Sequence, residues 1–561
     1  MREIIAEQPS KKKWDRKEVV ENIAKMERNK KEGVSQRQVA EEIGVARTTL
    51  QHWVKRKENI AGEKAIVELL ESPVGLVFLH QVVMAAHFVI TQVGVGGIRL
   101  VCEFLELSGL DKYVASSYGS QQKANQEMQQ SIAEYSKVET KRLSQDMQPK
   151  KISICQDETF HPETCLVAIE PVSNFILVEK YEENRDKQSW DKVMNQAIEE
   201  MKVEVIQSTS DEAKALLSHV NNGLGVHHSP DLFHIQRELT KATSASLASQ
   251  VRKAQETYLK ANEKLEERLK SLSEYKETSA NNTNNLMYFE RAVFEAQESK
   301  LSAHKQLEQK LSNQSRAKSA IKAISKAYHP FDLDSGAKLS TQKLESILLN
   351  QFREIEQVAK DAGVSDQSIK KIAKARKLLP QMCSSFNFFF QMCEQLVQAQ
   401  SLTSELEEVM YQLLIPAFYI KISYTKLKNS KEKQSALATA TILLVLATSK
   451  HYSFSLLSDK EQLNLFSLAK ECSQLFQRSS SCVEGRNGQL SLRHHSLHKL
   501  SNSKLLALTT IHNFFIKRND GSTAALRFFG QKPRDLFSWL LDKVSFPARP
   551  SQKRSLLALA S

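Results

Sequence analysis

Three acidic residues occupy positions from which they could bind a divalent metal ion together. Asp157 ends a short apolar segment with an alternating pattern, and Asp211 ends a second such segment. Glu484 lies much further along the chain, where a helical segment opens. Mg²⁺ prefers hard oxygen ligands, and two Mg²⁺ ions about 3.5–4 Å apart can activate a water or hydroxyl and stabilise the leaving oxygen of a phosphodiester. Three acids brought together in this way could support metal-dependent phosphodiester chemistry.

The segments around Asp157 and Asp211 predict a small sheet that would position these two acids. Short runs rich in Val, Ile and Leu predict three antiparallel strands, with Asn174 in the turn between the second and the third. A helix follows, then a fourth strand that ends on Asp211, then a shorter fifth strand. The predicted strands cover residues 151–158, 164–171, 175–182, 203–211 and 226–234, and the predicted helix covers residues 186–202. Neighbouring first and fourth strands would place Asp157 and Asp211 side by side.

This order of elements is that of a ribonuclease-H-like core, and the sequence resembles the DDE transposases of bacterial insertion sequences. Asp157 and Asp211 match the first two acidic positions of that family, and Glu484 is the best match to the third. The resemblance implies an α/β ribonuclease-H-like core within a mainly α chain, with an N-terminal helix-turn-helix and a large all-α insertion. It also implies that the three acids are the catalytic residues and the ligands of Mg²⁺, for which Mn²⁺ can substitute.

The same resemblance implies what the protein does and where. It implies an enzyme that cuts and joins the ends of an insertion element, with the element ends and the target DNA as partners. It implies a homo-oligomer on DNA, in the cytoplasm of a prokaryote at the nucleoid, and no membrane. Two alternatives stay open, namely a non-catalytic DNA-binding protein derived from a transposase and a metal nuclease without strand transfer.

The second metal ligand is ambiguous in the sequence. Asp231 follows the fifth predicted strand in Pro-Asp-Leu-Phe-His, a context that also resembles these transposases, and it could replace Asp211 as the ligand. The favoured interpretation is that Asp231 and His234 support the ligands or contact DNA.

Each acid also has an ordinary structural explanation. An Asp at a strand end before a helix is a common N-cap, which fits Asp211. Asp157 could face solvent, and Glu484 could form a salt bridge with Arg486. The argument for chemistry is that all three acids occur in the order the family requires.

Residues 35–53 predict a helix-turn-helix. Ser35 would cap its first helix, and Gly44 would allow the turn where a side chain would clash. The outward face of the second helix could read base edges in a major groove, and the basic residues that follow could contact phosphates. The DNA-binding residues predicted here are Arg47, Thr48, Gln51, Lys55 and Arg56, with Arg486 and Arg493 added from the C-terminal region.

The rest of the chain divides by composition and periodicity. Residues 242–326 are rich in Ala, Glu, Lys and Gln with apolar residues every three or four positions, which predicts a long helical hairpin. A cluster containing Arg493, His494, His495, His498 and Lys499 makes the late helix basic. The predicted domains are 1–60 helix-turn-helix, 61–148 helical connector, 149–239 first part of the core, 240–470 all-helical insertion, 471–545 last part of the core and 546–561 flexible basic tail.

Composition limits the classes of function. The net charge is +13 and the pI is about 9.1, which suits a polyanionic partner. Seven Cys without a CxxC pair argue against a disulfide scaffold and a structural zinc site. The N-terminus lacks the apolar core of a signal peptide. The apolar segment at residues 74–95 contains His and Gln side chains, which are costly in a bilayer, so a buried helix is expected there.

Overall fold

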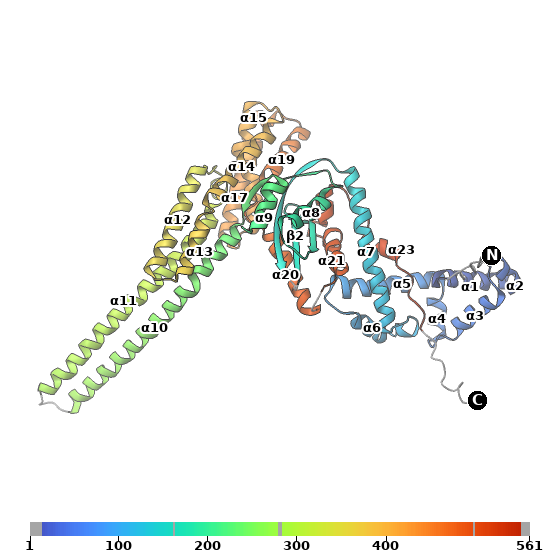
Figure 1. Ribbon diagram of the computed structural model, residues 1–561, viewed down its shortest axis with the longest axis horizontal. Helices are drawn as coiled ribbons and strands as arrows, with labels where there is room; N and C mark the ends of the chain where they lie inside the picture. The colour runs from blue at the N-terminus through green and yellow to red at the C-terminus, as the bar shows by residue number, and fades with distance from the viewer. Residues whose placement is uncertain (1–13, 161–162, 279–282, 498–499, 551–561) are drawn as a thin grey trace, which may run out of the picture.

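The protein is elongated, with a helical domain at one end, a sheet domain in the middle and a two-helix arm at the other end (Figure 1). The structure, a computed structural model, describes residues 14–160, 163–278, 283–497 and 500–550. The sheet domain is built from segments that lie far apart in the sequence, because the arm and its neighbouring helices separate the strands from the C-terminal helices.

A five-stranded mixed sheet forms the centre of the molecule. Its strand order is β3-β2-β1-β4-β5. β1 and β3 run antiparallel to β2, whereas β4 runs parallel to both β1 and β5. The strands are β1 Lys150–Phe160, β2 Thr164–Glu170, β3 Phe175–Tyr181, β4 Val203–Ser210 and β5 His227–Pro230. Parallel pairing of β1, β4 and β5 brings their carboxyl ends to one edge of the sheet.

Two strand predictions need correction. β1 continues past Asp157 to Phe160, because the pairing with β2 extends from Cys155 to the end of the strand. Asp157 therefore lies inside the strand and does not end it. β5 stops at Pro230, and His234 belongs to the first turn of the long helix that follows.

Both faces of the sheet are covered, which explains why its strands are apolar on both sides. Ile152 and Ile154 of β1 pack into one cluster with α7, α8 and the last helices of the chain. Cys155 packs on the opposite face with Val483 and Leu490 of α20. The elements nearest the sheet are α7 Tyr118–Asp146, α8 Lys187–Ile198, α9 Lys214–His219, η3 Val220–Leu224, α20 Ser481–Leu497, α21 Asn502–Phe514, α22 Ala524–Phe529 and α23 Leu536–Lys543.

The N-terminal domain contains three helices, α1 Arg16–Lys31, α2 Gln36–Ile43 and α3 Arg47–Glu58. Ser35 caps α2 through a capping box with Gln38, which satisfies backbone N–H groups that the helix cannot pair internally. Gly44 ends α2 with φ +73°, a left-handed conformation that favours glycine. Leu50 and Trp53 of α3 are buried against α1 and α2.

A helical connector joins this domain to the sheet. Its elements are α4 Lys64–Leu70, α5 Pro73–His87, the π-helical turn η1 Phe88–Val93, α6 Ile98–Leu107 and η2 Leu110–Lys112. The segment Pro73–Val93 is long and apolar enough to cross a membrane, and 56% of its most apolar window is buried inside the protein. Its buried face carries hydrogen-bonded polar groups, since His87 contacts Gln121 and Thr91 donates to Asn125.

The segment between β5 and α20 is helical wherever the structure describes it, apart from loops and one isolated bridge between Phe331 and Lys338. α10 starts directly after Asp231 and pairs with α11 to form the arm (Figure 1). Residues 281–282 of the predicted hairpin tip lie outside the described residues. The helices are α10 Leu232–Thr278, α11 Thr283–Ala327, α12 Thr341–Asp361, α13 Asp366–Arg376, α14 Leu379–Gln398, α15 Ser404–Val409, η4 Met410–Leu414, α16 Ile415–Ser423, η5 Tyr424–Lys426, α17 Ser430–Val445, η6 Leu446–Lys450, α18 Tyr452–Ser455 and α19 Asp459–Gln474.

The described part of the C-terminal tail, residues 546–550, is held against the connector and is not free. Arg549 forms an ion pair with the buried carboxylate of Glu71, which Arg16 also contacts at 2.7 Å. Phe546 stacks on His80 with 4.3 Å between ring centroids. These contacts place residues 546–550 on the connector, and residues 551–561 of the predicted flexible tail lie outside the described residues.

Candidate functional site

Three aspartates meet at the carboxyl edge of the parallel strands. Cys155 pairs with Thr209, so Asp157 and Asp211, each two residues further along, reach the same end of the sheet. Asp231 directly follows Pro230, the last residue of β5. Pro230 pairs with Ser210, the last residue of β4. The strand register therefore places the two predicted aspartates and the ambiguous third one at a single edge.

Asp157 is the most buried of the three predicted ligands, with 8% of its surface exposed. Its Oδ1 accepts a hydrogen bond from the backbone N–H of Glu158 at 2.8 Å, and its Oδ2 accepts one from Nδ2 of Asn487 at 3.2 Å. Burial raises the pKa of Asp157 to about 7, and the negative charges of Asp211 and Glu484 contribute to this increase. The site therefore holds mutually repelling carboxylates that a cation would stabilise.

Glu484 comes to this edge from α20, which lies across the face of the sheet that contains Cys155. Val483, its neighbour, is fully buried against the strands, and this anchors the first turn of α20. The Glu484 carboxylate lies 3.6 Å from Nε2 of His234 and 4.0 Å from Nη1 of Arg237, both in the first turns of α10. Glu484 and Asn487, one helical turn apart, therefore both point from α20 towards the acids.

His234 bridges two of the acids. Its Nδ1 lies 2.8 Å from Oδ2 of Asp231, and its Nε2 faces Glu484. The hydrogen bond with Asp231 raises the pKa of His234, and the charges of Asp157 and Asp211 add to the effect. The raised pKa favours the positively charged form of the imidazole, which compensates part of the negative charge at the edge of the sheet.

Asp231 is more deeply enclosed than Asp211. It is 2% exposed, and its carboxylate accepts hydrogen bonds from Ser480 and from the backbone N–H of Phe233 in addition to its contact with His234. Hydrogen bonds from His234 and Ser480 lower its pKa against the opposing effect of burial, which is the largest single influence. Asp211 is half-buried, and its Oδ1 accepts a hydrogen bond from the backbone N–H of Ala213 at 3.0 Å.

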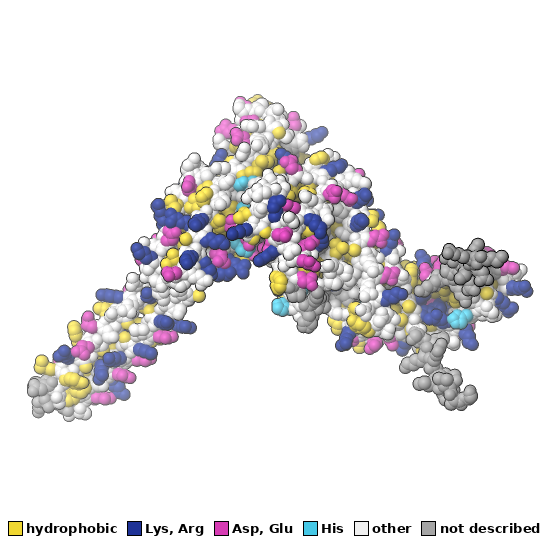
Figure 2. Space-filling model, viewed as in Figure 1, with side chains coloured by type: hydrophobic (Ala, Val, Ile, Leu, Met, Phe, Trp, Pro, Cys, Tyr) yellow, Lys and Arg dark blue, Asp and Glu magenta, His cyan; other side chains and the backbone are white. Residues whose placement is uncertain are grey.

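A pocket of about 300 Å³ opens beside these residues and is partly basic. Its lining includes the acids Asp211, Glu212, Asp231 and Glu238, together with His234 and with Lys371 and Lys374 of α13. Figure 2 shows Lys and Arg side chains gathered in the region where the arm meets the body of the protein. Positive charge next to the acids suits a polyanion whose phosphates must come close to them.

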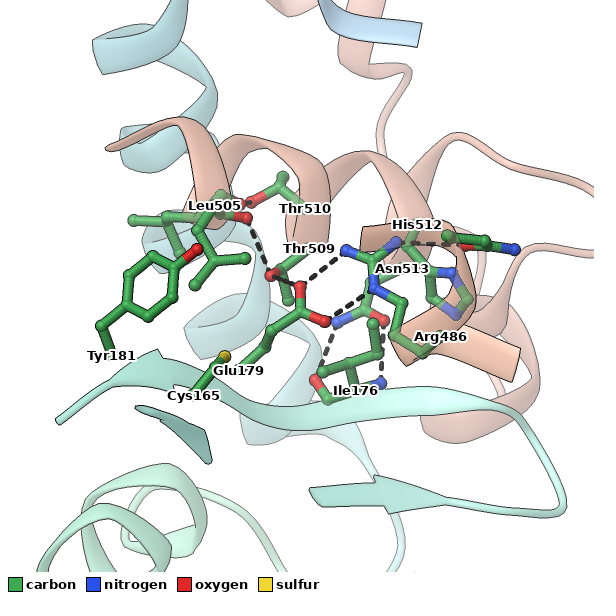
Figure 3. Close-up of polar contacts among 12 residues, drawn as sticks. Cys165, Ile176, Glu179, Tyr181, Arg486, Leu505, Thr509, Thr510, His512 and Asn513 are labelled. Carbon is green, nitrogen blue, oxygen red and sulfur yellow. Dashed lines mark hydrogen bonds and ion pairs between the residues drawn. The ribbon is translucent and has the colours of Figure 1, made fainter. Parts of the chain in front are cut away.

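Two arginines predicted to bind DNA are engaged inside the protein. Arg486 is 7% exposed, and its guanidinium makes two hydrogen bonds, of 2.7 and 2.6 Å, to the carboxylate of Glu179 on β3. Thr509 of α21 donates to the same carboxylate, as Figure 3 shows. Arg493 donates to the backbone carbonyls of Val93 and Gly94. The prediction is therefore corrected: Arg486 and Arg493 fasten α20 to the sheet and the connector.

The other members of the predicted basic cluster have different positions. His494 is buried, with Nε2 at 3.1 Å from the hydroxyl of Tyr181, and His495 is exposed. His498 and Lys499 lie outside the described residues. The sequence also allowed a salt bridge between Glu484 and Arg486. In the structure the partner of Arg486 is Glu179 instead.

The predicted DNA-binding residues of the helix-turn-helix all lie on the exposed side of α3. Arg47, Thr48 and Gln51 are exposed at the start of the helix, and Lys55 and Arg56 are exposed near its end. Their neighbours Leu50 and Trp53 point inward, so the outward face is fixed by the packing of the domain. This is the geometry in which a recognition helix presents side chains to a major groove.

Several residues of the site were not identified from the sequence. Asn487 had a usable signal, because it lies three positions after Glu484 on a helix and such residues share a face. Arg237, Ser480, Lys371 and Lys374 had none, since they reach the site only through tertiary packing.

The donor chemistry of the acids fits Mg²⁺, but the side chains are not gathered into a complete ligand set. Asp157, Asp211 and Glu484 offer only carboxylate oxygens, the ligands that Mg²⁺ prefers. Among the residues that the structure describes, no three His, Cys, Asp or Glu side chains are arranged closely enough to hold a metal ion. The repulsion that contributes to the raised pKa of Asp157 would be relieved by a cation.

The fold and the surface of α3 define a helix-turn-helix protein, and this architecture suggests DNA binding. Residues 25–67 match a family model described as helix-turn-helix, which confirms the predicted motif. Residues 410–556 match the model of a family of unknown function (DUF6399), and this range includes α20 with Glu484 and Asn487. Comparison with curated proteins and with solved structures gave no match.

Proposed function

We propose that this protein is a DNA transposase that cuts and joins the ends of an insertion element by metal-dependent phosphodiester chemistry. The observation that supports the proposal is that the strand register brings Asp157 and Asp211 to one edge of the sheet, where the carboxylate of Glu484 also acts on Asp157. The carboxylates of Asp211 and Glu484 are close enough to Asp157 that both contribute to the increase in its pKa. A carboxylate with a raised pKa next to other acids is frequent in catalytic sites.

We further propose that the sheet domain is a ribonuclease-H-like core. The strand order β3-β2-β1-β4-β5, with an antiparallel meander followed by parallel strands, supports this assignment. The placement of one acid on β1, one after β4 and one on a late helix supports it as well. The helices between β5 and α20 would then be an insertion into that core.

In this proposal the residues at the edge of the sheet have distinct roles. Asp157, Asp211 and Glu484 would hold Mg²⁺, which would supply the positive charge needed at the attacking and leaving oxygens. Asn487 orients the carboxylate of Asp157 through its hydrogen bond. Asp231 orients His234, which faces Glu484.

The rest of the chain would deliver the DNA to these acids. The exposed face of α3 would recognise the element ends, and Lys371 and Lys374 would contact phosphates next to the acids. The basic excess of the whole chain supports a polyanionic partner. The protein would act in the cytoplasm of a prokaryote, at the nucleoid.

The experiment is a cleavage and joining assay on DNA that carries the ends of the element encoding this chain, with Mg²⁺ or Mn²⁺. Asp157→Asn, Asp211→Asn and Glu484→Gln should each reduce cleavage by several orders of magnitude and leave DNA binding intact, because each change removes only a charge. Asp231→Asn serves as the comparison and should have a milder effect. Cleavage without joining by the parent protein would indicate a nuclease, and normal cleavage by all three variants would refute the proposal.

A second candidate is a non-catalytic DNA-binding protein derived from a transposase. The observation that favours it is that His234 lies between Asp231 and Glu484, while no complete metal ligand set is gathered among the described residues. In that case the parent protein would bind DNA through α3 and show no metal-dependent cleavage on any substrate that carries the element ends.

A further inference from the structure

The connector presents an apolar surface that no described part of the chain covers. On α5, Val74, Val77 and Phe78 are 82%, 50% and 62% exposed, although the opposite face of the same helix is buried. On α6, which packs beside α5, Leu100, Phe104 and Leu107 are 50%, 36% and 84% exposed. A helix that is apolar all round is normally covered on all sides, and an apolar patch of this kind on a protein surface marks an interaction site.

The side chains that flank this surface argue against two kinds of partner. The exposed charged residues of α6 are Arg99, Glu103 and Glu106, so the helix is acidic overall. An acidic rim repels both DNA and the anionic surface of a membrane. Figure 2 shows acidic and hydrophobic side chains together over α6 at the lower edge of the molecule. The partner is therefore expected to be a protein.

Two of the three exposed charges on α6, Arg99 and Glu106, are complementary to the same residues of a second α6 that runs in the opposite direction, whereas Glu103, near the middle of the helix, meets its own copy. Arg99 and Glu106 are seven residues apart, two helical turns, so they lie on the same side of the apolar stripe at its two ends. If a two-fold axis crosses the middle of α6, Arg99 of one copy lies beside Glu106 of the other, and the same pair forms again by symmetry. The apolar stripes then face each other between the two ion pairs.

We infer that the exposed face of α5 and α6 is a dimer interface, at which a second copy of this chain docks with its α6 antiparallel to the first. An isologous interface requires a self-complementary surface, and α6 provides one through its apolar stripe and the pairing of Arg99 with Glu106. The inference concerns the assembly of the protein without DNA, so it does not depend on the proposed catalytic activity.

The test uses the full chain and measures its mass in solution by sedimentation over a range of concentrations. The parent should be a dimer, and Leu107→Lys or Phe104→Lys should raise the dissociation constant at least tenfold. Leu463→Lys is the matched control, because Leu463 is 67% exposed on α19, outside the proposed interface, and it should leave the mass unchanged. Equal circular dichroism of all variants shows that they are folded.

Charge reversal gives a second readout that does not depend on the apolar substitutions. Arg99→Glu and Glu106→Arg should each weaken self-association, because each places like charges opposite each other. A mixture of the two variants should form heterodimers in preference to either homodimer, since both ion pairs are then restored with reversed sign. A parent that stays monomeric at concentrations up to about 100 μM has a dissociation constant above that value. This result would overturn the inference. A parent dimer whose dissociation constant is unchanged by both the apolar and the charge substitutions would overturn it as well.

Discussion

Removing one partner of the buried ion pair between Glu179 and Arg486 should strongly destabilise the sheet domain. The side chains are 0% and 7% exposed, and two hydrogen bonds join them, with Thr509 donating a third to Glu179. Glu179→Gln preserves the volume and removes the charge, which leaves the guanidinium of Arg486 buried without its counterion. Removing one partner of such a pair costs about 3–5 kcal/mol, whereas replacing both with apolar residues is often neutral. We therefore expect Glu179→Gln to lower the free energy of unfolding by about 3–5 kcal/mol and Glu179→Leu/Arg486→Met to recover most of that loss.

The assay must report on the sheet domain alone. The four tryptophans are Trp14 and Trp53 in the helix-turn-helix domain and Trp190 and Trp539 beside the sheet. In a background with Trp14→Phe and Trp53→Phe, urea unfolding followed by fluorescence reports only the sheet domain.

The matched control is the ion pair between Lys25 and Glu42, whose side chains are 38% and 55% exposed. Its loss through Glu42→Gln should cost about 0–1 kcal/mol, measured by circular dichroism because it lies in the other domain. A cost for Glu179→Gln as small as that of Glu42→Gln would refute the reasoning, as would a double variant less stable than the single one.

Three further predictions follow from the site and the helix-turn-helix. The raised pKa of Asp157, from 3.8 to about 7, means that the folded state binds this proton more tightly than the unfolded state. The contribution of the proton to stability is therefore complete below pH 3.8 and is lost as the pH rises through about 7. Asp157→Asn should flatten the fall in unfolding free energy between about pH 4 and pH 7, and an unchanged slope would contradict the assignment. Arg47→Ala with Gln51→Ala should reduce the preference for cognate over random DNA in a competition assay by about 1–3 kcal/mol for each of the two side chains that reads a base, whereas equal weakening for both DNAs would mean that α3 contacts only phosphates. Lys371→Ala with Lys374→Ala should weaken DNA binding of every sequence and reduce the slope of log affinity against log salt by about two, and an unchanged slope would remove these lysines from the interface.

Local signals made the helix-turn-helix and the strands predictable. The capping box at Ser35 and the left-handed Gly44 are encoded within a few residues of the elements they bound. The alternation of apolar residues located each strand to within a few residues. The end of β1 was placed too early, because the hairpin pairing with β2 and not the apolar pattern determines where that strand stops.

The surroundings of the acids were less predictable, because they depend on contacts between distant segments. Arg486 looked like a DNA-binding residue in a basic helix, yet its counterion Glu179 lies 307 positions earlier in the sequence. His234 looked like the end of a strand, yet Pro230 ends β5 and the helix that starts at Leu232 carries the imidazole to Glu484. No pattern within either segment contains this information.

The central claim is that Asp157, Asp211 and Glu484 hold a divalent cation together, and Mn²⁺ binding measured by electron paramagnetic resonance tests it most directly. The account predicts that the parent protein binds Mn²⁺, that Asp157→Asn, Asp211→Asn and Glu484→Gln each weaken binding at least tenfold, and that Asp231→Asn weakens it less. Binding of Mn²⁺ by all three variants with the affinity of the parent, or no binding by the parent in the presence of DNA that carries the element ends, would contradict it.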